Sequence, residues 1–281
     1  MQTRAGLVRQ ADHGSQMIRA DIPAVAADFV AQQPMIVVGA ADGDGRLWAT
    51  LLTGRPGFVR ASGTGTVEIA ARPRPSDPLA AALGGPARVG MIAIDPARRR
   101  RMRVNGRAQP VDGGLRVVPD QVYANCPKYI QKRHVLEIVD GPPGGAAVTG
   151  SVLEPGQIER ITAADTLFVA TSDDVGNTDA SHRGGNPGFV EVLSPTRLRW
   201  PDYPGNAMFM TLGNLELNPA AGLLFPDFAT GTTLQLSGTA RTDWSSGERH
   251  VDFTVTRVVE TPGAVPLRWS DPEYSRFNPT V

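Results

Sequence analysis

Short apolar runs separated by tight turns recur along the chain and predict antiparallel β-structure. Residues 35–41 read as a buried strand, an Asp/Gly turn follows at 42–45, and residues 48–52 predict the returning strand of a hairpin. Further strands are predicted at residues 58–61, 66–70, 89–94, 101–108 and 115–118.

Helical spacing is found in two places beside these strands. Ile22, Val25, Phe29 and Val30 predict an amphipathic helix that ends near Gln33 and Pro34. A second, short helix is expected around Leu79 and Leu83.

The same succession of patterns occurs twice. MIVVGAADGDG at 35–45 is matched by LFVATSDDVGN at 167–177, and Pro-Gly-Phe-Val occurs at 56–59 and again at 187–190. These anchors keep their order at an offset of about 132 residues, which indicates an internal duplication. Five or six short strands with one or two helices per copy favour two small barrels, and two β-sandwiches are the alternative.

The repeats divide the chain into four segments. They are an N-terminal extension at 1–21, a first repeat at 22–118, a connecting segment at 119–150, and a second repeat with its C-terminal tail at 151–281. Apolar spacing from Pro119 to Val139 predicts a helix broken at Pro127, and GPPGG at 141–145 predicts a flexible linker.

Composition and charge exclude several classes of protein. The formal net charge is zero, which argues against general nucleic-acid binding. Cys126 is the single cysteine, so an internal disulfide and a thiolate metal cluster are excluded and a reducing compartment is expected. Residues 1–22 lack the apolar run of a signal peptide, and no apolar stretch is long enough to span a bilayer. We therefore expect a cytoplasmic protein.

Familiar catalytic motifs are absent from the sequence. It contains no G-x-G-x-x-G, no P-loop lysine motif and no G-x-S-x-G elbow. Its histidines are scattered without metal-ligand spacing, so no metal site is predicted; they are His13, His134, His182 and His250.

One candidate anion-binding segment lies between the repeats. Lys128 and Lys132 are the only lysines, and both belong to the segment Asn125–His134, together with Tyr129 and Arg133. On a helix the two lysines would share one face, and an anion such as phosphate would relieve their repulsion. A solvated connecting helix is the alternative interpretation.

A second candidate lies in the second repeat. Residues 181–185, Ser-His-Arg-Gly-Gly, end a predicted strand, and the stretch Asn206–Asn214 is rich in Asn and Thr. Glycines let the backbone approach a ligand, and Asn, Thr and a helix start donate to phosphate oxygens. A plain loop with a surface histidine is the alternative. The first repeat has Leu51 and Leu52 where the second has His182 and Arg183, so an anion site here would be asymmetric.

Two other features are assigned no binding role. The run Arg98–Arg101, with Arg103, is predicted to be a solvated turn because the second repeat has a plain hairpin turn there. Cys126, beside a proline, is expected to be structural, and a place in the lining of the site is the alternative.

Three longer motifs identify a family resemblance. They are N-C-P-K-Y at 125–129, S-H-R-G-G-N-P-G-F at 181–189 and D-Y-P-G-N at 202–206. With a helix running into Asn218-Pro219 and a buried strand, they resemble the pyridoxamine 5′-phosphate oxidase-like, FMN-binding split-barrel family, in its tandem-barrel branch. The resemblance extends from about Val25 to Trp269 and implies a mainly β fold with short helices (α+β), built as two tandem split β-barrels.

The resemblance also implies a function and a set of site residues. It implies an FMN-dependent oxidoreductase of a small-molecule substrate, with FMN in a cleft between two barrels. Thr211 takes the place of the family's usual lysine, and Lys128 or Arg133 are the candidates to replace it. The expected cofactor-binding residues are Asn125, Lys128, Tyr129, Arg133, Ser181, His182, Arg183, Asn206, Thr211, Asn214 and Trp269. No catalytic residue is assigned.

Other expectations concern partners and rival functions. Electrons would arrive from a nicotinamide or a partner reductase, and a homodimer is compatible with exposed barrel surfaces. One rival is a heme-binding or heme-degrading split barrel, with His134, His182 or His250 as iron ligand. The other rival is a non-catalytic barrel that binds a ligand or a partner.

Overall fold

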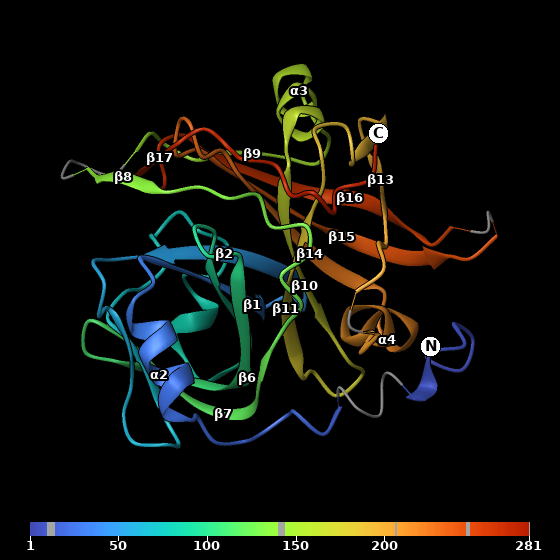
Figure 1. Ribbon diagram of the computed structural model, residues 1–281. Coiled ribbons are helices and arrows are strands. Elements are labelled where there is room, and N and C mark those ends of the chain that lie inside the picture. The colour runs from blue at the N-terminus through green and yellow to red at the C-terminus, as the bar shows by residue number, and fades with distance from the viewer. Residues whose placement is uncertain (10–14, 140–143, 206, 246–247, 281) are drawn as a thin grey trace.

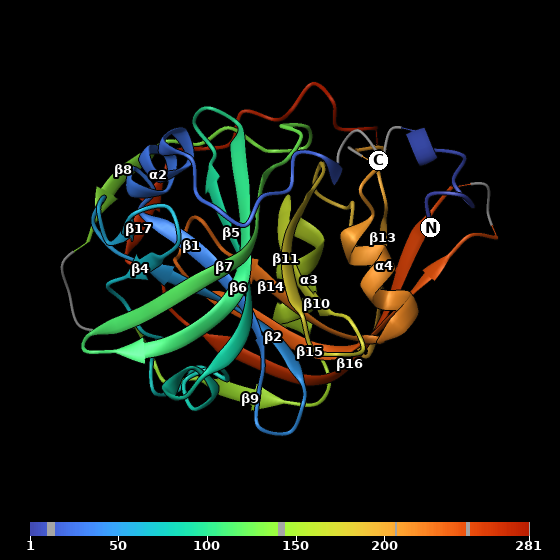
Figure 2. The ribbon, with the colours of Figure 1, turned by 90° about the horizontal axis from the view of Figure 1, so that it is seen from below.

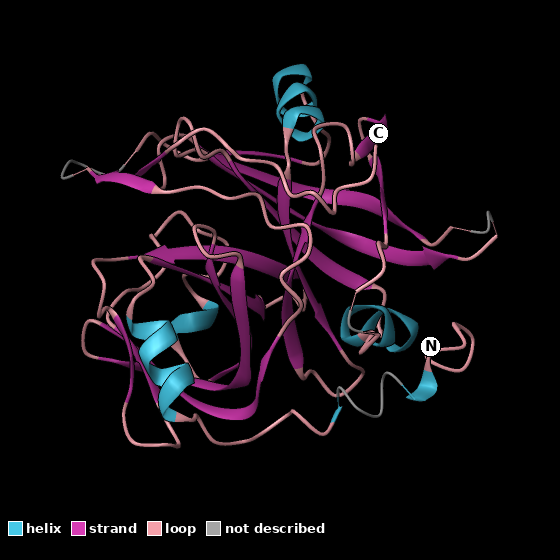
Figure 3. Cartoon of the chain, in the orientation of Figure 1, coloured by secondary structure: helices cyan, strands magenta, loops and turns pink. Residues whose placement is uncertain are grey.

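Two curled antiparallel sheets, one from each half of the chain, make up the molecule (Figure 1). The computed structural model describes residues 1–281 except 10–14, 140–143, 206, 246–247 and 281. Strands dominate, and the helices are short (Figure 3). The fold is a β-rich split barrel in two tandem copies, as the sequence predicted.

The first sheet has the strand order β2-β1-β5-β6-β7-β4-β3. Its strands are β1 (Met35–Ala41), β2 (Leu47–Thr53), β3 (Val59–Ala61), β4 (Val67–Ile69), β5 (Ala87–Asp95), β6 (Arg100–Val111) and β7 (Gly114–Ala124). Helix α2 (Ala24–Ala31) covers it and buries Phe29 and Val30, as predicted, whereas Val25 is exposed. The predicted short helix is a 3₁₀ turn, η1 (Ala82–Gly84).

The second sheet has the strand order β11-β10-β14-β15-β16-β13-β12, which repeats the first order strand by strand. Its strands are β10 (Thr166–Ser172), β11 (Thr178–Gly184), β12 (Glu191–Ser194), β13 (Arg197–Pro201), β14 (Ala220–Pro226), β15 (Thr233–Asp243) and β16 (His250–Thr261), with β9 (Val148–Gly150) beside β16. Helices α3 (Pro155–Ala163) and α4 (Met210–Leu217) complete this half.

Each barrel has its own apolar core, and a third core lies between them. Val38, Met91 and Val104 belong to the first barrel core, and Leu223 and Trp200 to the second. The third is formed by side chains from both halves, including Ile92, Phe168 and Leu224. Burial of apolar surface therefore holds the two barrels together as well as each one separately.

Two glycines at equivalent positions allow the halves to pack closely. β5 packs against β11 and β14 against β2 (Figure 2). A Cβ at Gly90 would lie 2.4 Å from the backbone of Asp179, and one at Gly222 would lie 2.6 Å from the backbone of Trp48. Contacts this short forbid any side chain, so glycine sets the distance between the barrels at both crossings.

The helix predicted between Pro119 and Val139 is wrong. β7 continues through this region to Ala124 because burial alternates along it, and Pro119 lies where the β6–β7 register shifts. The chain then runs without helix to β8 (Val135–Ile138), which pairs with β17 (Leu267–Trp269). Most of the predicted linker at 141–145 lies outside the described residues. Within the described parts of the chain, no helix has the length and apolarity needed to cross a bilayer.

Candidate functional site

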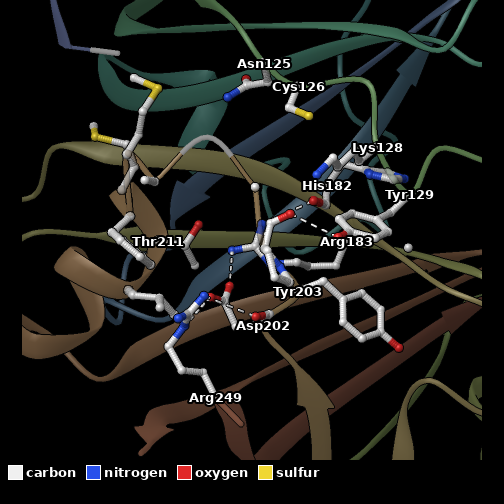
Figure 4. A pocket seen from close by; sticks show the side chains of 18 of the residues that line it. Asn125, Cys126, Lys128, Tyr129, His182, Arg183, Asp202, Tyr203, Thr211 and Arg249 are labelled. Carbon is white, nitrogen blue, oxygen red and sulfur yellow. Dashed lines mark hydrogen bonds and ion pairs between the residues drawn. The ribbon is translucent and has the colours of Figure 1, made fainter. Parts of the chain in front are cut away.

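A pocket of about 280 Å³ lies where the two halves meet (Figure 4). One wall comes from β6 and the segment that follows β7, and the other from β11 and the loop that leads into α4. Arg249, just before β16, lies on the second side. Neither half alone forms this pocket.

The β6 wall arises from strand alternation. Met102 and Val104 enter the first barrel core, so Arg101 and Arg103 project from the opposite face toward the second half. The predicted solvated turn is therefore wrong for these two arginines. It is right for Arg98, which is exposed and bonds to Asp95 beside the turn. The alternation of arginine with apolar residues was the signal for a strand.

Arg103 is held by a buried polar cluster that bridges the halves. Its Nη1 donates to Asp179 Oδ2 at 2.7 Å, and Tyr123 Oη and Asn105 Nδ2 donate to Asp179 Oδ1 at 3.1 and 3.0 Å. Burial raises the pKa of the Tyr123 hydroxyl, which keeps it protonated as a donor. The cluster neutralises Arg103 and fixes β6 relative to β11.

Arg101 has no such carboxylate. Its Nη1 lies 2.7 Å from His182 Nδ1 and donates to the His182 carbonyl at 3.4 Å. Because guanidinium can only donate, His182 Nδ1 must be the acceptor and the imidazole neutral. Burial, with Arg101, Arg183 and other arginines nearby, lowers the pKa of His182 well below its usual value. His182 thus orients Arg101 without adding charge.

Arg183 and Arg249 share one carboxylate. Arg249 Nε donates to Asp202 Oδ2 at 3.0 Å, and Arg183 Nη2 lies 3.9 Å from Asp202 Oδ1. Burial lowers the pKa of Arg183, and Asp202 offsets only part of that effect. Figure 4 shows this group on the opposite side of His182 from Asn125 and Cys126.

The pocket therefore carries excess positive charge. Asp202 is the one acidic side chain among the described lining residues. It faces four cations besides the neutralised Arg103: Arg101, Lys128, Arg183 and Arg249. Burial and repulsion from Arg103 and Arg183 lower the pKa of Arg101 to about 9. The buried Nε atoms of Arg101 and Arg183 have no hydrogen-bond partner within the described structure. Orphaned donors and unbalanced cations together are the chemistry of an anion site.

Strained backbone is concentrated around the same pocket. Tyr129, Ala207 and Phe209 all line it and have left-handed φ angles of 65°, 58° and 55°. The Tyr129 ring lies 5.1 Å from that of Tyr203, and its hydroxyl donates to the Pro204 carbonyl at 3.0 Å. Such conformations persist where surrounding contacts impose them, and they are typical of ligand sites.

Six of the expected cofactor-binding residues line the pocket: Asn125, Lys128, Tyr129, His182, Arg183 and Thr211. Ser181 lies directly behind, where its Oγ accepts a hydrogen bond from Thr211 Oγ1 at 3.0 Å. Asn206 lies outside the described residues. The structure thus brings together the two segments that the sequence singled out separately.

Three expected residues lie elsewhere. Arg133 is buried in an ion pair with Asp165, Asn214 donates to Thr171, and Trp269 packs edge-on against Phe228. Their partners all belong to the second repeat, and none of the three lines this pocket. Lys132 also points away, toward Glu273 at 3.3 Å.

Several pocket residues were not assigned from the sequence. Arg101, Arg103 and Arg249 lacked a recognised motif, and only strand alternation pointed to the first two. Asp202 and Tyr203 belong to the D-Y-P-G-N motif, which marked the family but gave no role to either side chain.

Neither His134 nor His250 lines the pocket, and His13 lies outside the described residues. His134 is exposed and His250 is half-buried at the start of β16. Across the described residues, no group of three or more His, Cys, Asp or Glu side chains is arranged to hold a metal ion.

Comparisons with known proteins concern the fold. No protein-family model matches the sequence, and no curated protein is significantly similar to it. Solved structures with a similar arrangement include pyridoxamine 5′-phosphate oxidase-like and flavin-binding proteins, each matching about two fifths of the chain.

One is a putative pyridoxamine 5′-phosphate oxidase from Lactobacillus delbrueckii, with 19% identity, 38% of this chain and 93% of that chain covered, and a TM-score of 0.31. HupZ from Group A Streptococcus has 14% identity, 40% and 98% coverage, and a TM-score of 0.31. An FAD-binding protein from Mesorhizobium loti has 12% identity, 41% and 97% coverage, and a TM-score of 0.30.

Proposed function

We propose that the cationic pocket binds the phosphate of FMN and that the protein is an FMN-dependent oxidoreductase of the tandem split-barrel branch. The observation that carries the proposal is Arg101, a guanidinium that has no carboxylate partner and lies near the cationic Arg183, in a pocket that Lys128 also lines. An anion placed among these cations would satisfy the orphaned donors and restore the charge balance. The resemblance of the sequence motifs to the FMN-binding split-barrel family favours FMN as the phosphate-bearing molecule.

The residues present fit such a group. Arg101, Arg183 and Lys128 would hold the phosphate, with the Thr211 hydroxyl beside them. His182 holds the Arg101 guanidinium in place, and Asp202 anchors Arg183. When bound, FMN supplies two-electron transfer chemistry.

The remainder of the pocket suits a planar ring. Tyr203, Met208 and Phe209 line the side formed by the loop that enters α4. Aromatic and thioether side chains make favourable contacts with flat ring systems and exclude water from them. The left-handed backbone at Phe209 fixes this wall in advance of binding.

A pair of flavins tests the proposal. The protein is titrated with FMN and with riboflavin, which lacks the phosphate, and binding is followed by flavin fluorescence. We expect FMN to bind at least 100-fold more tightly than riboflavin, because charge-assisted hydrogen bonds to phosphate each contribute about 1.5–3 kcal/mol. Arg183→Ala should remove most of this preference.

Arg107→Ala is the matched control, because Arg107 is an exposed arginine on the same strand as Arg101. Equal affinity for the two flavins, or an unchanged preference in Arg183→Ala, would contradict phosphate binding in this pocket. A Soret band in the purified protein would favour the heme alternative instead.

A further inference from the structure

A second cavity, of about 340 Å³, adjoins the cationic pocket. The two share Arg101 and Asn125 in their linings. It lies between α2 and the β6–β7 hairpin, at the open mouth of the first barrel. Its size is in the range of small-molecule sites.

Its surface is mainly apolar and partly open to solvent. Phe29, Met102 and Val122 form the floor and belong to the first barrel core. Val25 and Met17 form the sides and remain 65% and 51% exposed. Exposed apolar side chains gathered in one cavity indicate a binding surface rather than a packing defect.

One side of the cavity is fixed by the backbone. Arg19 pairs with Val122, with N–H···O distances of 3.1 and 2.6 Å in the two directions. This bridge holds the segment that carries Met17 along the edge of β7. The cavity is therefore preformed in the structure.

The rim of the cavity is cationic. Arg19 and Arg100 are exposed there, and the Arg100 guanidinium lies 5.2 Å from the ring centroid of Phe29. Arg99 is paired with Glu273, so it contributes little charge. None of the described lining residues is acidic. An apolar body with a negatively charged group matches this surface.

We propose that this cavity is a binding site for a small amphipathic organic anion. The apolar part lies on Phe29, Met102 and Val25, and the anionic group lies at the rim beside Arg100. The inference is independent of the proposed function because the residues that carry it, Phe29, Met102, Val25 and Arg100, do not line the cationic pocket. If both hold, the shared wall at Arg101 places this ligand next to the flavin.

The probe for the test is 1-anilinonaphthalene-8-sulfonate, an aromatic anion that fluoresces in apolar surroundings. We expect saturable binding of one probe per native chain, competed by decanoate but not by decanol at the same concentration. Val25→Glu should weaken binding at least 10-fold, because it places a carboxylate in the cavity. Arg100→Gln should weaken it by about 3- to 10-fold.

Two control variants establish where on the protein the probe binds. Val175→Glu changes a valine that is 67% exposed on the other half, and it should leave probe binding unchanged. Arg183→Ala should also leave it unchanged, which excludes binding of the probe in the cationic pocket. Circular dichroism and thermal melts confirm that each variant is folded.

The outcomes distinguish the two proposals. Probe binding that is unaffected by Val25→Glu, or abolished by Arg183→Ala, would overturn the apolar site. Loss of FMN binding in Arg183→Ala with normal probe binding would support both sites separately. If FMN does not bind at all, the proposed function fails. The effect of Val25→Glu on probe binding still decides whether the second cavity is a binding site.

Discussion

Equivalent strands form a second cleft at the opposite end of the interface between the barrels, and it has a different chemistry. This cleft is lined by β2 and β15, which correspond to β11 and β6 in the cationic pocket. By strand register, Thr233 replaces Arg101, Gln235 replaces Arg103 and Leu51 replaces His182.

In the second cleft the polar groups of the two strands are satisfied internally, and the cations that line it, Arg72 and Arg74, come from the segment after β4. The Asp77 carboxylate accepts hydrogen bonds from Thr50, Gln235 and the Leu79 backbone, and burial raises its pKa. Gln235 also donates to the Ala49 carbonyl at 3.0 Å. The same backbone geometry therefore supports an internally bonded contact in one cleft and the proposed anion site in the other. The difference teaches that the side chains on equivalent strands, rather than the fold, decide what each cleft can bind.

The largest effect is expected at the buried Arg103–Asp179 ion pair, which the second cleft lacks. Asp179→Leu leaves Arg103 buried without a counterion, which should reduce the free energy of unfolding by about 3–5 kcal/mol. Adding Arg103→Gln, which copies the equivalent Gln235, should restore most of the lost stability. Urea denaturation measures the free energy of unfolding of the single and the double variant. If the double variant is no more stable than the single one, the unpaired charge is not the cause.

The next effect concerns ligand affinity. Arg101→Thr copies Thr233 and should weaken FMN binding about 10- to 100-fold, which is the contribution of one charge-assisted contact to phosphate. Thr233→Ala in the second cleft should change the affinity less than 2-fold. Isothermal titration should also give one FMN per chain. A stoichiometry of two would show that the second cleft binds FMN as well.

Lowering the pH should destabilise the folded protein through His182, which lies in the cationic pocket. Its pKa is lowered in the folded protein, so the unfolded chain binds the proton more readily and stability falls as the pH drops below about 6.5. One such group lowers the free energy of unfolding by about 1.4 kcal/mol between pH 7.5 and 5.5. His182→Gln should remove this part of the pH dependence. Identical pH profiles of the two proteins would rule out His182 as its source.

The smallest expected effect is the difference in FMN affinity between variants of the two lysines. Lys128 lines the pocket, and Lys128→Ala should weaken FMN binding by about 3- to 10-fold. Lys132 is paired with Glu273 outside it, and Lys132→Ala should change the affinity less than 2-fold. Fluorescence titration of both variants makes the comparison. Equal losses would indicate a general effect of net charge.

Local patterns were sufficient to predict most of the fold. The strands at 35–41 and 89–94 lie close to β1 and β5 because continuous apolar runs bounded by turns have few alternatives. The segment from Pro119 to Val139 failed because its apolar residues also fit strand alternation. Pairing with β6, which is a long-range contact, decided between the two.

The candidate site was predictable where a motif carried it. His182 and Arg183 were found through the S-H-R-G-G-N-P-G-F motif, and Lys128 through N-C-P-K-Y. Arg101 was missed because its role depends on a strand from one half facing the other half. Arg133 was expected at the pocket because its sequence neighbours are there. The chain turns at Tyr129, where φ is 65°, and Arg133 pairs with Asp165 instead.

Arg101 and Arg183 come from different barrels but belong to one polypeptide, and this has a consequence for dilution. In an assembly of separate subunits, a site shared across the interface is lost when the subunits dissociate. A tether keeps the two halves at an effective concentration on the order of millimolar, whatever the amount of protein present. The cationic pocket is therefore complete in every folded chain, and its affinity for an anion should not vary with protein concentration.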